Sequence, residues 1–131
     1  MGLLKRIFGI CETKPPGNSA CWEYAGGKIE IDLERAPELS VAGCAIRLES
    51  NVLPEKVLVL HGTDEKYYAF RNKCTHMGRR IDPLEGSPNI RCCSVSKSTF
   101  DYEGNLISGP AKGPLKPFQT DAANGKLTII I

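Results

Sequence analysis

Two short stretches of this sequence carry side chains that bind transition metals. Cys74-Thr75-His76 puts a thiol and an imidazole two residues apart, so both leave an extended segment on the same side. Cys92-Cys93 offers two more thiols further along the chain. Thiolate sulfur and imidazole nitrogen are common ligands of zinc and iron. The pattern predicts a metal site built from two loops, although a buried thiol beside a solvated imidazole would give the same Cys-x-His sequence.

The cysteine count and the first residues favour a metal over disulfides. Six cysteines in 131 residues are too few for a disulfide scaffold. Residues 1–11 (MGLLKRIFGIC) place Lys5 and Arg6 inside the apolar stretch that a signal peptide or a membrane span would need. We therefore expect no transmembrane segment and a cytoplasmic protein with reduced thiols. The helix-like apolar spacing of residues 1–11 allows a weak contact with a membrane surface or a partner.

Composition and charge predict one turn-rich domain. The 17 Lys and Arg nearly balance the 15 Asp and Glu, leaving a net charge of +2, which argues against a nucleic-acid partner. The 13 glycines and 9 prolines favour a β-rich fold over a helical bundle. The KPPGNS motif at residues 14–19 interrupts regular structure. We therefore expect residues 1–22 to form an N-terminal extension and residues 23–131 to form the domain.

The elements that must position the two loops are short strands. β-rich runs separated by turn residues predict an all-β fold, with strands at 28–33, 43–49, 56–61, 67–71, 89–93, 99–102, 105–108 and 126–131. Between residues 72 and 118 such runs are few, whereas Gly, Pro, Cys, His and Ser are dense. The sequence therefore predicts a loop-built site inserted in a β frame.

The residues around both loops resemble the Rieske iron-sulfur domain. The resemblance is carried, in order, by CTHMG (74–78), IDPLEG (81–86), STFDYEGN (98–105) and SGPAKGPLKPF (108–118). Small Rieske ferredoxins and the Rieske-type small subunits of reductases are the most similar members in size. The resemblance implies an antiparallel β sandwich with a small loop-built cluster-binding subdomain, here at about residues 72–118.

The resemblance also implies a [2Fe-2S] cluster held by two thiolates and two imidazoles. Cys74 and Cys93 match the ligands of the inner iron, and His76 matches one ligand of the outer iron. The position of the second histidine falls on Ser96, whose hydroxyl is a poor substitute for an imidazole. Cys92 is the alternative ligand for this fourth position. Three states of the site are open: a cluster with a substituted fourth ligand, a single iron or zinc ion, or no metal.

Two further sets of residues match positions that surround the cluster in the family. Ser98 matches a serine that donates a hydrogen bond to cluster sulfur, and Phe100 stands where members of higher potential have Tyr. Gly109 and Pro110 match the loop that covers the cluster. His61, the only other histidine, is expected in a hairpin loop with a solvated ring. Arg79, Arg80, Lys97 and Lys112 are candidates for a basic rim around the site, against the alternative of an ordinary solvated surface.

The predicted function is one-electron transfer, by a Rieske-type carrier or a small electron-transfer subunit of an oxidoreductase. Its partner would be a redox protein, namely a reductase or an oxygenase component. The alternative is a degenerate Rieske module that uses an empty or mononuclear metal site for protein interaction or sensing. The sequence shows no nucleophile, base or substrate pocket, which favours a non-catalytic electron carrier or oxidoreductase subunit over an independent enzyme.

Overall fold

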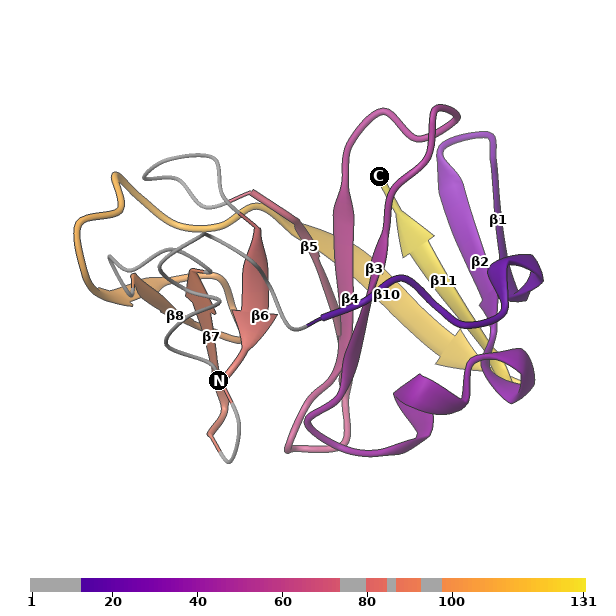
Figure 1. Ribbon diagram of the computed structural model, residues 1–131, viewed down its shortest axis with the longest axis horizontal. Coiled ribbons are helices and arrows are strands. Elements are labelled where there is room, and N and C mark those ends of the chain that lie inside the picture. The colour runs from indigo at the N-terminus through magenta and orange to yellow at the C-terminus, as the bar shows by residue number, and fades with distance from the viewer. Residues whose placement is uncertain (1–12, 74–79, 85–86, 93–97) are drawn as a thin grey trace.

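The computed structural model describes residues 13–73, 80–84, 87–92 and 98–131, which form two antiparallel sheets (Figure 1). The larger sheet has seven strands in the order β1-β2-β11-β10-β5-β4-β3, and the smaller has four in the order β6-β7-β8-β9. The larger sheet comprises β1 (Trp22–Ala25), β2 (Lys28–Asp32), β3 (Ala45–Leu48), β4 (Val57–His61), β5 (Tyr67–Arg71), β10 (Pro117–Ala123) and β11 (Lys126–Ile130). The smaller sheet comprises β6 (Ile81–Pro83), β7 (Asn89–Cys92), β8 (Thr99–Asp101) and β9 (Leu106–Ser108).

Helical structure in the described residues is limited to three short 3-10 turns. These are η1 (Ser19–Cys21), η2 (Leu33–Arg35) and η3 (Pro37–Ser40). No helix in this part of the chain is both long enough and apolar enough to cross a membrane. The predicted all-β fold, an antiparallel sandwich with a smaller subdomain, is confirmed.

Each predicted strand has an observed counterpart, but three observed strands were not predicted. β1 is short, and its burial alternates only between partial and exposed. β6 contains Pro83, and proline within a run argues against a strand because it has no N–H to pair. β10 begins with Pro117 and buries only Phe118 among its seven residues. These strands lack the apolar alternation from which a half-buried strand is recognised.

β4 joins the two parts of the molecule because both of its faces are buried. Val57 and Val59 belong to a core enclosed by the larger sheet and η3, whereas Leu58 and Leu60 belong to a second core that includes the smaller sheet. Strand geometry explains this division, since successive side chains point to opposite faces. The continuous apolar run VLVL is the sequence signature of such a doubly buried strand.

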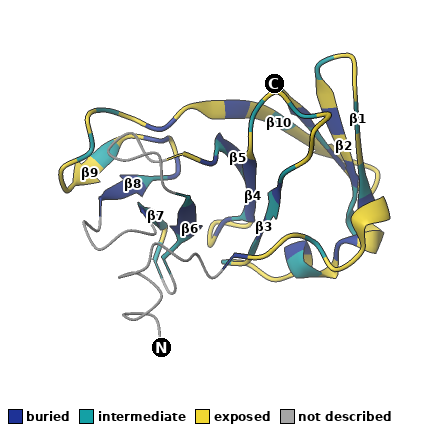
Figure 2. Cartoon of the chain, turned by 45° about the horizontal axis from the view of Figure 1, so that its top comes forward, coloured by how far each residue is buried: buried dark blue, intermediate teal, exposed yellow. Residues whose placement is uncertain are grey.

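The second core attaches the smaller sheet to the larger one. Leu58, Leu60 and Phe70 from β4 and β5 pack with Ile81, Ile90, Cys92, Phe100, Tyr102 and Leu115. All of these side chains are less than a tenth exposed. Figure 2 shows the buried strands of the two sheets next to each other, with β9 at an outer, more exposed edge. The smaller sheet is therefore held in place mainly by packing on β4 and β5.

The described part of the predicted extension contacts both sheets. The Thr13 N–H donates to Asp82 Oδ1 at 3.0 Å, and both residues are buried. One residue later, the Lys14 carbonyl accepts the N–H of Arg47 in β3 at 3.0 Å. Cys21 is buried in the first core. The domain boundary at residues 22 and 23 stays a prediction, and residues 1–11, predicted to contact a membrane or partner, lie outside the described residues.

Candidate metal centre

The two predicted metal loops fall largely outside the described residues. Cys74, His76, Cys93 and Ser96 belong to the ranges 74–79 and 93–97, so their assignment as ligands stays a prediction. The described residues contain no group of three or more His, Cys, Asp or Glu side chains that would hold a metal ion. The structure does describe the residues at which each loop begins and ends.

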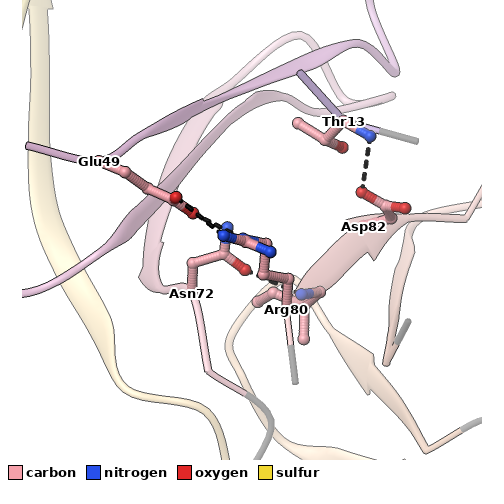
Figure 3. Close-up of polar contacts among 6 residues, drawn as sticks. Thr13, Glu49, Asn72, Arg80 and Asp82 are labelled. Carbon is pink, nitrogen blue, oxygen red and sulfur yellow. Dashed lines mark hydrogen bonds and ion pairs between the residues drawn. The ribbon is translucent and has the colours of Figure 1, made fainter. Parts of the chain in front are cut away.

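The first loop begins at a buried asparagine that contacts both sheets. The Asn72 N–H donates to the carbonyl of Lys56, next to β4, at 2.8 Å. Its side-chain Oδ1 accepts the N–H of Ile81, the first residue of β6, at 2.8 Å. Asn72 is 3% exposed, and the two ends of the Cys74–His76 loop meet at this side chain (Figure 3).

The first loop ends at an arginine that forms a bidentate ion pair. Arg80 Nε and Nη2 donate to the two carboxylate oxygens of Glu49, just after β3, at 2.7 and 2.9 Å (Figure 3). The hydrogen bond from Arg80 lowers the pKa of the Glu49 carboxyl, and the same bond raises the pKa of Arg80. Arg80 was a candidate for the basic rim, but Glu49 neutralises its charge within the molecule.

The second loop begins at Cys92 and ends at Ser98. The Cys92 N–H donates to the Ser98 carbonyl at 2.8 Å, which closes the base of the loop. Along β7 buried and partly exposed residues alternate, so Cys92 shares the buried face with Ile90. Cys92 is fully buried and belongs to the apolar core between the sheets.

Ser98 lies directly beneath the loop that contains Gly109 and Pro110. Ser98 is fully buried, and its Oγ accepts the N–H of Ala111 at 3.2 Å. The hydroxyl accepts in this bond, so it keeps its own hydrogen to donate. A Cβ added at Gly109, whose φ is +99°, would lie 2.5 Å from the Ser98 Cα. Only glycine permits this approach, and the two loops are therefore in close contact.

Phe100 has a structural role that is plain from its surroundings. It lies in β8 opposite Ile90, is fully buried and belongs to the core between the sheets. Its predicted position beside a cluster stays a prediction.

His61 differs from its expected environment. It is the last residue of β4 rather than part of the hairpin tip, and its ring is partly buried. Its Nδ1 lies 2.8 Å from the Leu39 carbonyl, and the ring stacks on Tyr67 with centroids 4.7 Å apart. The prediction of a solvated ring was therefore wrong, because η3 and β5 supply a carbonyl and an aromatic face.

Sequence reasoning missed Asn72 and Glu49. Asn72 is two residues from Cys74, and this closeness to a candidate ligand was the only signal available for it. Glu49 is more than twenty residues from either loop in the sequence, and nothing local indicates its pairing with Arg80. Both are recognised only once the two sheets are placed together.

Comparisons with known proteins identify the family. The family model of the Rieske [2Fe-2S] domain matches residues 35–119, a range that includes both metal loops. The chain belongs to the Rieske domain family. The resemblance that the four sequence stretches predicted is thereby confirmed.

Relatives of this Rieske domain occur in proteins of different size. The glycine betaine monooxygenase oxygenase subunit of Pseudomonas aeruginosa is 30% identical over an alignment of 120 residues. The alignment covers 77% of this chain but only 28% of that subunit. The ferredoxin of carbazole 1,9a-dioxygenase from Nocardioides aromaticivorans matches with a TM-score of 0.58 and 18% identity, covering 69% of this chain and 86% of that one. The plasma membrane Rieske protein of Synechocystis gives a TM-score of 0.56 at 18% identity, with 66% and 86% covered. These two solved structures show the same fold.

The donors predicted from the family resemblance match the family cofactor at three positions out of four. Cys74, Cys93 and His76 are of the right chemical types, and Ser98 Oγ accepts the Ala111 N–H, which leaves its own hydrogen to donate. The second imidazole is missing, because the chain has only two histidines and the Nδ1 of His61 lies against the Leu39 carbonyl. A cluster in this chain would therefore have an atypical outer ligand.

Proposed function

We propose that this Rieske domain is a one-electron carrier, either as a small ferredoxin-like protein or as an electron-transfer part of an oxidoreductase. The observation that carries the proposal is the family match across both metal loops, together with the hydrogen bonds that close the base of each loop. When bound, a [2Fe-2S] cluster supplies a centre that accepts and releases one electron at a time. The chain's own residues would hold it, shield it from water and set its potential.

Cys74, Cys93 and His76 are the ligands that we assign to the cluster. The burial of Cys92 supports Cys93 as the thiolate of the second loop, since Cys92 fills a place in the apolar core. Moving its sulfur to a metal would empty that place and break the alternation of β7. Ser96 or an exchangeable small molecule would complete the outer iron.

Two features of the predicted site favour a low reduction potential. One neutral imidazole is missing, and Phe100 has no hydroxyl to donate to the cluster. We expect a potential at or below the lower end of the roughly −150 to +300 mV range of Rieske centres. With one histidine ligand fewer to lose a proton, the fall in potential at alkaline pH should also be smaller than in two-histidine clusters.

The partner that we propose is a redox protein, either a reductase or an oxygenase component. The oxygenase subunit and the ferredoxin among its relatives support this class of partner. A cytoplasmic location remains part of the proposal.

Metal analysis of anaerobically purified protein tests the proposal. We expect iron and acid-labile sulfide in equal amounts, about two of each per chain, and a rhombic electron paramagnetic resonance signal after reduction. One metal per chain without sulfide would overturn electron transfer and favour the mononuclear site. Colourless protein would favour the alternative of a degenerate module used for protein interaction.

Ser96→His tests which residue takes the fourth position. If position 96 faces the outer iron, the variant should bind more cluster and its potential should rise, because a neutral imidazole replaces a poor ligand. Cys92→Ala is the matched control, since it removes the neighbouring thiol, adds no ligand and keeps an apolar side chain in the core. A loss of cluster in Cys92→Ala, with no gain in Ser96→His, would contradict the assignment of Cys93.

A further inference from the structure

The two ends of the predicted first metal loop are held by contacts with residues that lie far away in the sequence. Loop residues 73–79 enter from Asn72, whose N–H is tied to the larger sheet through the Lys56 carbonyl. They leave through Arg80, whose guanidinium is tied to the same sheet through Glu49. The Asn72 side chain then accepts the N–H of Ile81 and brings both ends together.

We propose that Asn72, Glu49 and Arg80 are positioning residues that fix the Cys74–His76 loop, and so determine how tightly this loop holds its metal group. We refer to these three residues as the loop clamp. The proposal rests on the proposed function, because it assigns the retention of the cluster to side chains that do not touch it. Residues that orient metal ligands typically change metal affinity 10- to 100-fold when removed.

Burial gives Asn72 its importance in the loop clamp. Its side chain is 97% buried, and the Asn72–Ile81 hydrogen bond joins residues nine apart in the sequence. Among the described residues, its Nδ2 has no hydrogen-bond partner although it is shielded from water. A buried donor without a partner costs about 1–3 kcal/mol, so Asn72 carries this cost at the position where its Oδ1 accepts the Ile81 N–H.

The ion pair between Glu49 and Arg80 restrains the orientation of the guanidinium as well as its distance from the carboxylate. Two parallel hydrogen bonds to one carboxylate fix the plane of the guanidinium, which a single contact would not do. The pair joins residues 31 apart in the sequence, and the side chains are 34% and 26% exposed. The backbone at Arg80 is therefore anchored where the loop ends.

A second ion pair of the same kind provides a matched control. Arg71 Nε donates to Glu55 Oε1 at 2.6 Å, with side chains 41% and 24% exposed. Arg71 belongs to β5 and precedes Asn72, so this pair lies outside the segment that Asn72 and Arg80 delimit. Glu55 also pairs with Lys116 Nζ at 3.5 Å, so Glu55→Gln removes at least as much ion pairing as Glu49→Gln, but only Glu49→Gln releases the end of the loop.

The test compares the rate at which anaerobically purified protein loses iron to a chelator. We expect Glu49→Gln and Asn72→Ala to release iron at least about tenfold faster than wild type. Glu55→Gln should stay within about twofold of wild type, since an ordinary surface pair contributes little. Arg80→Lys keeps the positive charge but loses the bidentate geometry, so it should resemble Glu49→Gln if position matters and wild type if charge alone matters.

A second measurement tests the loop clamp in metal-free protein. Asn72→Ala removes the acceptor of the Ile81 N–H, so hydrogen exchange at Ile81 should be faster, whereas Glu55→Gln should leave it unchanged. Wild-type protein that binds no iron or sulfide would overturn the proposed function alone. Equal iron release from Glu49→Gln and Glu55→Gln, or unchanged exchange at Ile81 in Asn72→Ala, would overturn the loop clamp.

Discussion

The two sheets of this Rieske domain differ in how they are stabilised. The larger sheet pairs strands of four or more residues and, with η3, encloses a core of its own. The smaller sheet has strands of three or four residues, and its buried side chains pack against Leu58, Leu60 and Phe70 of the larger sheet. Small sheets need such a surface to be stable. The residues at which the predicted metal loops end, Arg80 and Ser98, thus lie next to strands of the sheet that depends on the other sheet.

Phe100→Ala should have the largest effect and should separate the two sheets. Removing this fully buried ring from the shared core is expected to cost about 3–5 kcal/mol of unfolding free energy. Hydrogen exchange should increase in β7 and β8, while β2 and β11 keep their protection. Leu127→Ala is the comparison, because it removes a side chain from the core of the larger sheet and should increase exchange in both sheets. Equal loss of protection in both sheets in Phe100→Ala would contradict the dependence.

Gly109→Ala should have the next largest effect, and Gly125→Ala in the larger sheet provides its control. Both glycines have positive φ, +99° and +75°, so both substitutions strain the backbone by about 1 kcal/mol or more. Only at Gly109 would the new Cβ also collide with Ser98, whereas nothing lies within 4 Å at Gly125. We expect a cost of at least about 2 kcal/mol for Gly109→Ala and about half of that for Gly125→Ala. Urea unfolding midpoints measure the stability costs of both substitutions. Equal midpoints would show that the loop containing Gly109 shifts to make room for the new Cβ.

The difference between the two sheets also explains which strands could be predicted from the sequence. Strands such as β4 and β11 are recognisable because their apolar patterns report burial in a core. β6 was missed, although the IDP motif was part of the family resemblance, because its register depends on β7 and on the Asn72 side chain. Local sequence reports burial and turn chemistry, whereas the position of the smaller sheet depends on contacts between distant residues.

The candidate site likewise contains residues that the sequence indicated and residues that it did not. Ser98 and Gly109 were predicted from the family resemblance, and the structure brings them into contact, while their roles beside a cluster stay predictions. Asn72 and Glu49 were not predicted, because their roles exist only after β3, β5 and β6 have assembled. Cys92 and Cys93 could not be distinguished by type, and the burial of Cys92 now favours Cys93 as ligand.

Glu49→Gln should reduce stability by a smaller amount that depends on pH. The folded-state pKa of Glu49 is lowered by Arg80, so its stabilisation is complete above the unfolded pKa of about 4.3 and is lost as pH falls through the folded value. Near neutral pH we expect the variant to be about 1 kcal/mol less stable than wild type. Urea unfolding of metal-free protein should show this difference shrinking as the pH falls below about 4. A difference that stays constant in acid would mean that the ion pair is not its source.

Tyr68→Phe should have the smallest effect, at the hairpin that connects β4 and β5. The Tyr68 hydroxyl donates to Asp64 Oδ2 at 2.5 Å, and its ring stacks on Tyr102, which follows β8. Burial and the bond to Asp64 raise the pKa of Tyr68 to about 12. A raised folded-state pKa gives stability that is complete below the unfolded value of about 10 and is lost as pH rises toward 12.

The Tyr68 hydroxyl thus stabilises the hairpin of the larger sheet in a way that alkaline titration can detect, whereas its ring contacts Tyr102 next to the smaller sheet. Tyr68→Phe keeps the stacking on Tyr102 and loses only the hydroxyl, at a cost of about 0.5–1 kcal/mol. Ultraviolet titration of wild type should show a tyrosine that ionises at about pH 12, and the variant should lack it. If this late ionisation persists in Tyr68→Phe, the Tyr68 hydroxyl is not its source and the hydrogen bond to Asp64 does not stabilise the hairpin in this way.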